Sequence, residues 1–208
     1  AAAKQLLVHK PLLAYIMKNT LGEYADLDVE TIARDFIEGD IRAGSDPVDV
    51  RCLSGPLVFG PRNEDDSLDD GTVRYDVLFR ARRPVGDGTL GLIVNIEPQA
   101  HMPDYSLAKR AAYYCARLLS AQRGTWPSGD EYDRLEKVCS IWLCMNPKPG
   151  EADSLTEYAM RERVLRGSVR RDPLEYDLQS IVIACLPQAG GYNGFTETLA
   201  TLFSFETT

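Results

Sequence analysis

The amino-acid sequence predicts an α/β fold in which a mixed β-sheet is flanked by helices. Two strand-like segments, residues 72–82 and 90–99, are separated by the turn sequence PVGDG. A clear helix pattern follows at residues 106–122, and another apolar strand pattern follows at residues 138–145. Two neighbouring strands, a helix and a further strand are typical of a sheet with helices packed on its faces.

The composition is that of an ordinary folded protein. The chain has 208 residues, of which 44% are hydrophobic and 26% are charged, and these values predict one domain over residues 1–208. No uninterrupted apolar run approaches the ~20 residues of a membrane helix, which argues against a membrane-spanning protein. Lysines and His9 interrupt the apolar residues near the N-terminus, so we expect no signal peptide and a cytoplasmic location.

Cysteine and histidine usage limits the metal chemistry. The five cysteines form no CxxC pair, and most of them lie inside apolar runs. We therefore expect reduced thiols in the core rather than disulfides or zinc ligands. The chain has only two histidines, His9 and His101, which argues against a histidine-rich metal site.

The formal net charge of −8 argues against a protein that coats nucleic acid through its overall field. The charge is nevertheless segregated along the chain. Acidic residues gather at 64–70, and basic residues gather at 80–83, 109–110 and 161–171. A local basic groove is therefore compatible with the negative total, although each basic cluster by itself is more often a solvated face.

The N-terminal third predicts helices followed by irregular chain. Residues 10–19 predict a helix, and Asp28 is the expected N-cap of a second helix that continues to about Phe36. Residues 50–59 are strand-like but contain Gly55 and Pro56. The acidic residues 62–71 predict a loop.

Residues 72–82 alternate as a half-buried strand does. Its two faces are expected to carry Val73, Tyr75, Val77 and Phe79 on one side and Arg74, Asp76, Leu78 and Arg80 on the other. After a turn at 84–88, the strand at 90–99 ends in three polar residues at alternate positions: Asn95, Glu97 and Gln99.

The second half begins with the clearest helix. Ser106 is its expected N-cap, and Gly124 lies just past its end. A short helix is expected at 132–137, before the strand at 138–145. The remaining pattern predicts, in order, a helix at 152–165, a strand at 178–186, a glycine-rich turn at 190–194 and a helix at 196–203.

The hairpin turn decides how Asp76 and Glu97 lie. A turn at residues 86 and 87 would pair Val85 with Gly88 and place Asp76 directly opposite Glu97. A turn at residues 87 and 88 would place Asp76 opposite Gln99 instead. Both registers put the three polar side chains on one face of the sheet, because they differ by two residues.

Directly opposed carboxylates have Cβ atoms ~5 Å apart and repel each other. A divalent cation between them would reverse the sign of the interaction, because hard oxygen ligands at about 2.1 Å suit Mg²⁺. Alternatively, Arg74 or Arg80 on the same face neutralises the acids in a surface ion cluster. The spacing alone leaves both interpretations open.

The order of an aspartate, a hairpin, Glu97-x-Gln99 and a long helix resembles the PD-(D/E)XK nuclease superfamily. More narrowly, the chain is similar to the PD-(D/E)XK nuclease family transposases, a bacterial group of recombination-promoting nucleases. The matching stretches are FIEGD (36–40), EDDSLDDGTVRYDVLF (64–79), LIVNIEPQ (92–99), YSLAKRAAYYCARLLSAQRG (105–124) and VCSIWLCMNP (138–147). They define a nuclease core at about residues 5–147, and residues 150–208 form an extension that matches less.

This resemblance implies a restriction-endonuclease-like αβββαβ core and Mg²⁺-dependent hydrolysis of DNA, with Mn²⁺ as a substitute. It implies that Asp76 and Glu97 ligate the metal, with the Pro98 carbonyl as a further ligand. Gln99 stands where much of the superfamily has a lysine, and Glu38 matches an additional N-terminal acid. Because glutamine offers hydrogen bonds but no charge, weak or lost activity remains open.

The helix at 106–122 carries Lys109, Tyr113 and Arg117 at intervals of four residues, which places them in one stripe. The resemblance implies that this helix flanks the active site, where the stripe would contact DNA phosphates and bases. The alternative is a solvent-facing helix edge, with Tyr113 and Tyr114 packed in the core.

We therefore expect a metal-dependent DNA endonuclease linked to transposition or recombination. A catalytically degenerate nuclease fold that binds DNA or protein is one alternative, and a structural protein with a simple ion cluster is another. The superfamily often works as dimers, so a homodimer stays open alongside DNA as the partner, and no membrane partner is expected.

Overall fold

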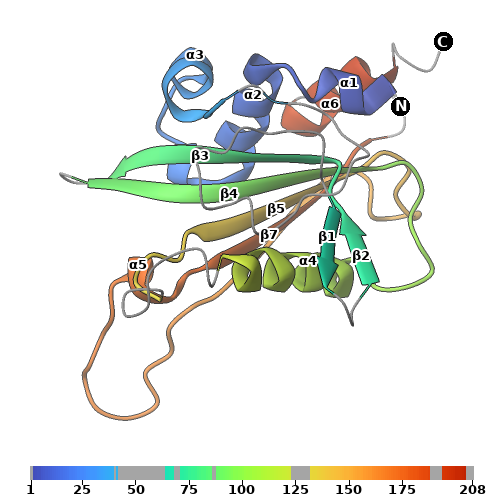
Figure 1. The fold of residues 1–208 in the computed structure, drawn as a ribbon. Coiled ribbons are helices and arrows are strands. Elements are labelled where there is room, and N and C mark those ends of the chain that lie inside the picture. Colours follow the sequence, from blue (N-terminus) through green and yellow to red (C-terminus); the bar gives the residue numbers. More distant parts are fainter. Residues whose placement is uncertain are drawn as a thin grey trace.

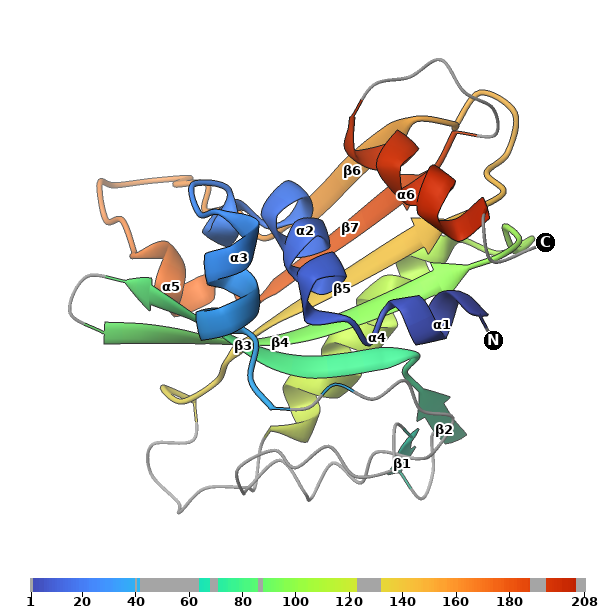
Figure 2. The same ribbon diagram turned by 90° about the horizontal axis from the view of Figure 1, so that it is seen from above.

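The computed structural model describes residues 2–39, 41, 64–67, 71–85, 88–122, 132–187 and 194–204. Within these residues, a five-stranded mixed sheet has helices on both faces, which confirms the predicted α/β class (Figures 1 and 2). No helix in the described ranges is long and apolar enough to cross a lipid bilayer.

The sheet has the strand order β3-β4-β5-β7-β6. Its strands are β3 (Val77–Val85), β4 (Gly88–Gln99), β5 (Lys137–Cys144), β7 (Gln179–Cys185) and β6 (Ser154–Ala159). β3 and β4 form an antiparallel hairpin, β4, β5 and β7 are parallel neighbours, and β6 is antiparallel to β7 at one edge. The strands expected at 138–145 and 178–186 are confirmed as β5 and β7.

One face of the sheet is covered by several helices and the other mainly by one (Figures 1 and 2). The first layer contains α1 (Ala2–Leu6), α2 (Lys10–Thr20), the short turn η1 (Gly22–Tyr24), α3 (Val29–Thr31) with its π-helical continuation η2 (Ile32–Phe36), and α6 (Phe195–Ser204). The second layer is α4 (Leu107–Ala121), and α5 (Pro173–Tyr176) is a single turn before β7. The helices expected at 10–19, 28–36, 106–122 and 196–203 are thereby confirmed.

Two apolar cores follow from these layers. Met17 of α2 and Leu199 of α6 pack with strand residues such as Val94 on the first face. Leu118 of α4 packs with Trp142 and its neighbours on the second face. Because β4 and β5 are buried on both faces, their alternate residues divide between the two cores.

The expected helix N-caps are present. The Asp28 carboxylate accepts a hydrogen bond from the Thr31 backbone N–H at 2.8 Å. The Ser106 hydroxyl accepts one from the Lys109 backbone N–H at 3.4 Å. Such caps satisfy backbone donors that have no partner inside the helix, so they fix where each helix begins.

The strand expected at 72–82 is interrupted. β2 (Gly71–Arg74) pairs with β1 (Glu64–Ser67) in a separate two-stranded ribbon, where the sequence predicted an acidic loop. The chain bends at Asp76 before β3 enters the main sheet. Val73 and Tyr75 therefore pack toward α4, whereas Val77 and Phe79 pack toward α2. Their predicted common face is wrong, because two irregular residues break the strand alternation.

Two predicted helices are also wrong. Residues 152–165 contain β6 and extended chain, because pairing with β7 overrides the local helix preference of this stretch. Residues 132–134 form a turn, and Lys137 already belongs to β5.

At the outer edge of β3, Ile37 makes an isolated bridge with Ala81.

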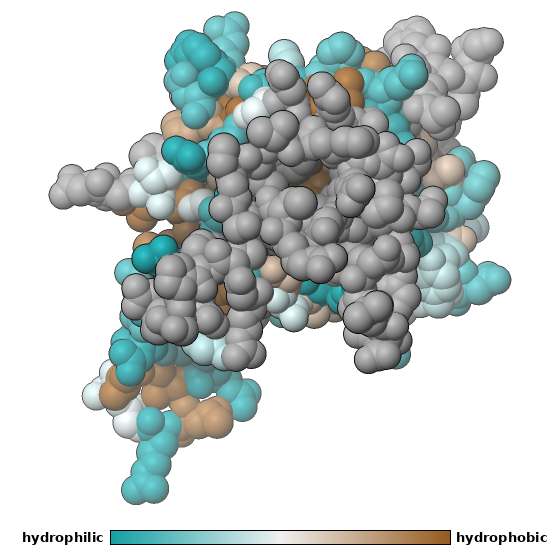
Figure 3. Space-filling model, viewed as in Figure 1, coloured by the Kyte–Doolittle hydropathy of each residue, from teal (hydrophilic) through white to brown (hydrophobic). Residues whose placement is uncertain are grey.

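An arm at residues 160–172 projects from the body between β6 and α5 (Figure 1). Figure 3 shows hydrophilic and hydrophobic residues together at this projection. Leu165 is 81% exposed and Val169 is 69% exposed, and the arm contains Arg161, Arg163, Arg166, Arg170 and Arg171. In the C-terminal extension at 150–208, β6 is therefore followed by an exposed basic arm.

The four cysteines in the described residues are buried free thiols, as expected: Cys115, Cys139, Cys144 and Cys185. The segment at 50–59, with Cys52 in it, lies outside the described residues. The same is true of residues 86–87 and of most of the turn expected at 190–194.

Candidate functional site

The β3–β4 register brings the two predicted acids together. Val85 pairs with Gly88, and Val77 pairs with Ile96. Continued by one residue, this register sets Asp76 opposite Glu97, which is the first of the two predicted alternatives. The site therefore lies where the chain enters β3 and where β4 ends.

Glu97 is a buried carboxylate, with 4% of its surface exposed. Its Oε1 accepts a hydrogen bond from the Asp76 backbone N–H at 3.1 Å. The pKa of Glu97 is raised to about 8, mainly by burial and then by the negative charge of Asp76. The Asp76 N–H and the charge of Arg110 oppose this shift only in part. The folded structure therefore disfavours the ionised form of Glu97.

Asp76 is more accessible, since its side chain is 20% exposed. It forms an ion pair with Lys4 of α1, whose side chain is 37% exposed. Arg80, one of the predicted neutralising residues, forms its ion pair with Glu136 at 2.9 Å. Among the side chains that the structure describes, none forms an ion pair with Glu97; the side chain of Arg74 lies outside that set.

A polar strip continues from Glu97 along the face that meets α4. Asn95 donates from Nδ2 to Ser140 Oγ at 3.2 Å, and Trp142 donates from Nε1 to the same oxygen at 2.9 Å. The Asn95 Oδ1 atom is buried and has no hydrogen-bond partner within the described ranges. The floor of the site therefore holds an oxygen acceptor in addition to the carboxylate of Glu97.

Arg110 of α4 lies between two phenols and an indole. It donates to Tyr114 OH from Nη2 at 2.7 Å and from Nε at 3.2 Å, and to Tyr105 OH from Nη1 at 2.7 Å. Its guanidinium carbon is 5.1 Å from the ring centroid of Tyr114 and 5.2 Å from that of Trp142. These contacts hold a positive charge within electrostatic reach of Glu97.

The predicted stripe on α4 lies one residue away from this arrangement. Lys109 and Tyr113 are exposed, while Arg117 is buried and donates from Nη1 to Tyr113 OH at 2.9 Å. The residues that interact with Glu97 are instead Arg110 and Tyr114. The spacing of the apolar residues in α4 could have predicted that Arg110 and Tyr114 face the site, because Tyr114 belongs to the buried face of this helix.

Gln99 lies two residues beyond Glu97 on the same strand. Its Nε2 donates to the His101 backbone carbonyl at 2.5 Å, within a loop that Asn146 also holds through the Ala100 carbonyl at 2.7 Å. His101 itself is exposed. Pro98, the predicted carbonyl ligand, lies between Glu97 and Gln99 and pairs with Leu143 of β5.

Glu38 is not brought to this site. Its backbone N–H donates to the Arg80 carbonyl at 3.0 Å, and its side chain forms an ion pair with Arg82. These contacts lie beside the middle of β3, several residues along the strand from Asp76.

Over the described ranges, no three histidine, cysteine, aspartate or glutamate side chains gather closely enough to hold a metal by themselves. Asp76 and Glu97 are neighbours through the hydrogen bond from the Asp76 backbone N–H, and the charge of Asp76 raises the pKa of Glu97. The chain matches no protein-family model, and searches of curated proteins and of solved structures also returned no match.

Proposed function

We propose that the protein is a Mg²⁺-dependent endonuclease that hydrolyses DNA phosphodiester bonds on a restriction-endonuclease-like fold. The observation that carries this proposal is the buried Glu97 beside Asp76, with no ion-pair partner for Glu97 in the described part of the chain. A buried carboxylate normally has a compensating partner, and one without it is a frequent mark of a functional site. The resemblance noted in the sequence adds transposition or recombination as the setting.

The donor set fits a magnesium ion. Mg²⁺ is usually held by one or two carboxylates and keeps several waters, so it needs no cage of protein ligands. Asp76 and Glu97 supply two hard oxygen donors, and the partial exposure of Asp76 leaves room for water and substrate. A cation here would offset the burial and the negative charge of Asp76, which together raise the pKa of Glu97. Lys4 would then share or yield its contact with Asp76.

Four residues have separate roles in the proposed hydrolysis. Asp76 and Glu97 would hold the metal, which when bound would activate water and neutralise charge on the phosphate. Gln99 can position a water molecule through its amide oxygen, because its amide nitrogen already donates to the His101 carbonyl. Arg110 adds a fixed positive charge on the α4 side of the site.

One observation favours a second candidate, a DNA-binding module that does not cut. Gln99 carries no charge, and its amide is tied to the loop after β4. A lysine in its place would steady an attacking hydroxide with a full charge. In this second candidate function, the basic groups of the protein bind DNA, and the phosphodiester bond is not hydrolysed.

Supercoiled-plasmid nicking with Mg²⁺ or Mn²⁺ tests the proposal. Asp76→Ala and Glu97→Ala are each expected to reduce nicking by at least about 100-fold, the order of loss seen when one hydrogen-bond donor that stabilises a transition state is removed. Glu157→Ala is the matched control, because Glu157 is an exposed carboxylate on β6, and it should nick as wild type does.

Nicking by Glu97→Ala at the wild-type rate would refute the endonuclease. A wild-type protein that retards DNA on a gel in Mg²⁺ yet leaves the plasmid supercoiled would favour the non-cutting module. Residual nicking that survives in both acid variants points to a contaminating nuclease and counts against the proposal.

A further inference from the structure

Arg110 is anchored by neutral groups rather than by a carboxylate. Three of its five N–H donors go to the phenolic oxygens of Tyr114 and Tyr105, and its plane lies near the rings of Tyr114 and Trp142. No described carboxylate forms an ion pair with it. Its orientation is therefore fixed while its charge is left uncompensated by direct contact.

Lys4 provides the contrast within the same site. Its ammonium group is already in contact with the Asp76 carboxylate, so its charge is neutralised locally. Arg110 acts on Glu97 only through space. Of these two cations, Arg110 is the one with charge and N–H donors available to a second anion.

The arginine side chain suits a phosphate. Its planar guanidinium presents donors in a fork that matches two phosphate oxygens, and holding it in place in advance reduces the entropy lost on binding. The remaining two N–H donors of Arg110 have no acceptor within the described ranges. Tyr105 is 55% exposed, so its hydroxyl hydrogen can also donate to an oxygen of a bound anion.

We propose that Arg110 contacts the phosphate of a bound DNA strand and supplies the positive charge that Gln99 lacks. This inference rests on the proposed function, because it takes DNA as the ligand of the site. Tyr105 and Tyr114 are then positioning residues, which hold the guanidinium on the α4 side of Asp76 and Glu97. The competing explanation is that Arg110 only fastens the start of α4 to the aromatic rings beneath it.

Duplex binding without metal separates the two explanations. The probe is a fluorescently labelled DNA duplex, followed by anisotropy in EDTA over a range of salt concentrations. A protein that neutralises one phosphate fewer loses about 0.9 from the slope of log K against log salt. Arg110→Gln should lower this slope by about 1 and weaken binding by about tenfold. Arg34→Gln is the control, because Arg34 is exposed on η2, in the helix layer opposite α4.

Tyr105→Phe tests the positioning role in a variant that should fold normally, because Tyr105 is exposed. It removes one anchor of Arg110 without changing any charge. We expect binding about threefold weaker with an unchanged salt slope, by loss of roughly one hydrogen bond's contribution. Circular dichroism and the unfolding midpoint check the fold of each variant.

The outcomes distinguish this inference from the endonuclease proposal. An Arg110→Gln protein that is folded, and that binds DNA with the wild-type slope and affinity, overturns the phosphate contact even if wild type nicks plasmid. A lowered slope in a protein that never nicks supports the contact and refutes the endonuclease. If Arg110→Gln does not fold, Tyr105→Phe decides, and wild-type affinity in that variant overturns the contact. Wild type that binds no duplex at all overturns both.

Discussion

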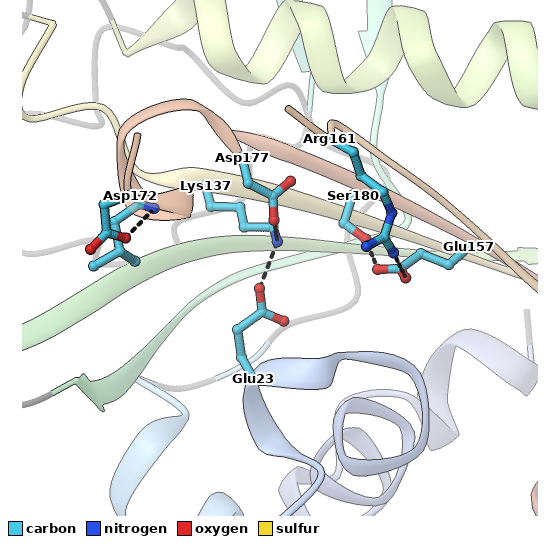
Figure 4. A network of polar contacts seen from close by, with 8 residues as sticks. Glu23, Lys137, Glu157, Arg161, Asp172, Asp177 and Ser180 are labelled. Carbon is cyan, nitrogen blue, oxygen red and sulfur yellow. Dashed lines mark hydrogen bonds and ion pairs between the residues drawn. The ribbon is translucent and has the colours of Figure 1, made fainter. Parts of the chain in front are cut away.

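Two charge clusters are buried on the central sheet, on opposite faces and toward opposite ends of the parallel strands. Lys137, at the start of β5, donates to Glu23 Oε1 and to Asp177 Oδ2, both at 2.6 Å (Figure 4). Glu97, near the end of β4, meets Asp76 and has no described ion-pair partner. The first cluster has one cation between two anions, whereas in the second Lys4 pairs with Asp76 and Glu97 is left without an ion pair among the described residues.

The pKa shifts of the two buried groups distinguish a charge with ion-pair partners from one without them. Burial alone would lower the pKa of Lys137, but hydrogen bonds to Asp177 and Glu23 raise it above its ordinary value. The pKa of Glu97 is raised because its burial is not compensated. The Lys137 cluster joins η1, β5 and the residue after α5, so it is complete as a structural element. We propose that a bound cation completes the Glu97 cluster.

Removal of the cation from the complete cluster has the largest expected effect on stability. Lys137→Met leaves the Glu23 and Asp177 carboxylates without their shared partner, and breaking such a pair costs about 3 kcal/mol. Urea unfolding at neutral pH measures this loss. Arg170→Gln is the matched control, because it breaks an exposed pair with Glu162 and should change stability by no more than about 0.5 kcal/mol.

A loss below about 1 kcal/mol in Lys137→Met, similar to that of the control, would remove the distinction between the two clusters. It would mean that Glu23 and Asp177, which are partly exposed, are solvated well enough without Lys137.

In the Glu97 cluster, removal of the charge should stabilise the protein. Glutamine keeps an oxygen that can accept the Asp76 N–H but carries no charge, so we expect the variant to be more stable than wild type in metal-free buffer at pH 9. The expected gain is about 1–3 kcal/mol, the usual cost of an uncompensated buried polar group. Chemical denaturation in EDTA, with the two proteins side by side, measures it.

The pH dependence of this gain follows from the raised pKa of Glu97. Below pH 4.5 both folded and unfolded states hold the proton, and the charge costs nothing. Between pH 4.5 and about 8 the unfolded state loses its proton first, so wild-type stability falls as pH rises. The difference in stability between Glu97→Gln and wild type should therefore grow as the pH rises across this window and level off above about pH 8. A difference that stays constant with pH would contradict the buried, uncompensated carboxylate.

The acid pair could be predicted from sequence because the hairpin encodes it. The pairing of Val85 with Gly88 sets every pair along β3 and β4, and Glu97 keeps its place on the face toward α4. The break before Val77 could not be predicted in this way. It depends on the β1–β2 ribbon, which competes for the residues just before β3.

The cations of the site were missed for two different physical reasons. Lys4 reaches Asp76 from a helix 72 residues earlier in the chain, and no local pattern encodes that contact. Arg110 was overlooked because two stripes on α4, offset by one residue, have the same spacing. Packing of Tyr114 against Tyr75 and Trp142 selects the stripe that faces the sheet. Local periodicity therefore predicts that α4 is a helix, but it does not predict which of the two stripes faces the sheet.

If Asp76 and Glu97 share a divalent ion, metal must stabilise the folded protein through these two carboxylates. Wild type at pH 8 should gain about 1.4 kcal/mol in unfolding free energy when Mg²⁺ or Mn²⁺ is about tenfold above its dissociation constant. Glu97→Gln and Asp76→Ala should gain little, while Glu157→Ala should gain as much as wild type. Equal stabilisation of wild type and Glu97→Gln, or none in wild type, would contradict a metal site at these two carboxylates.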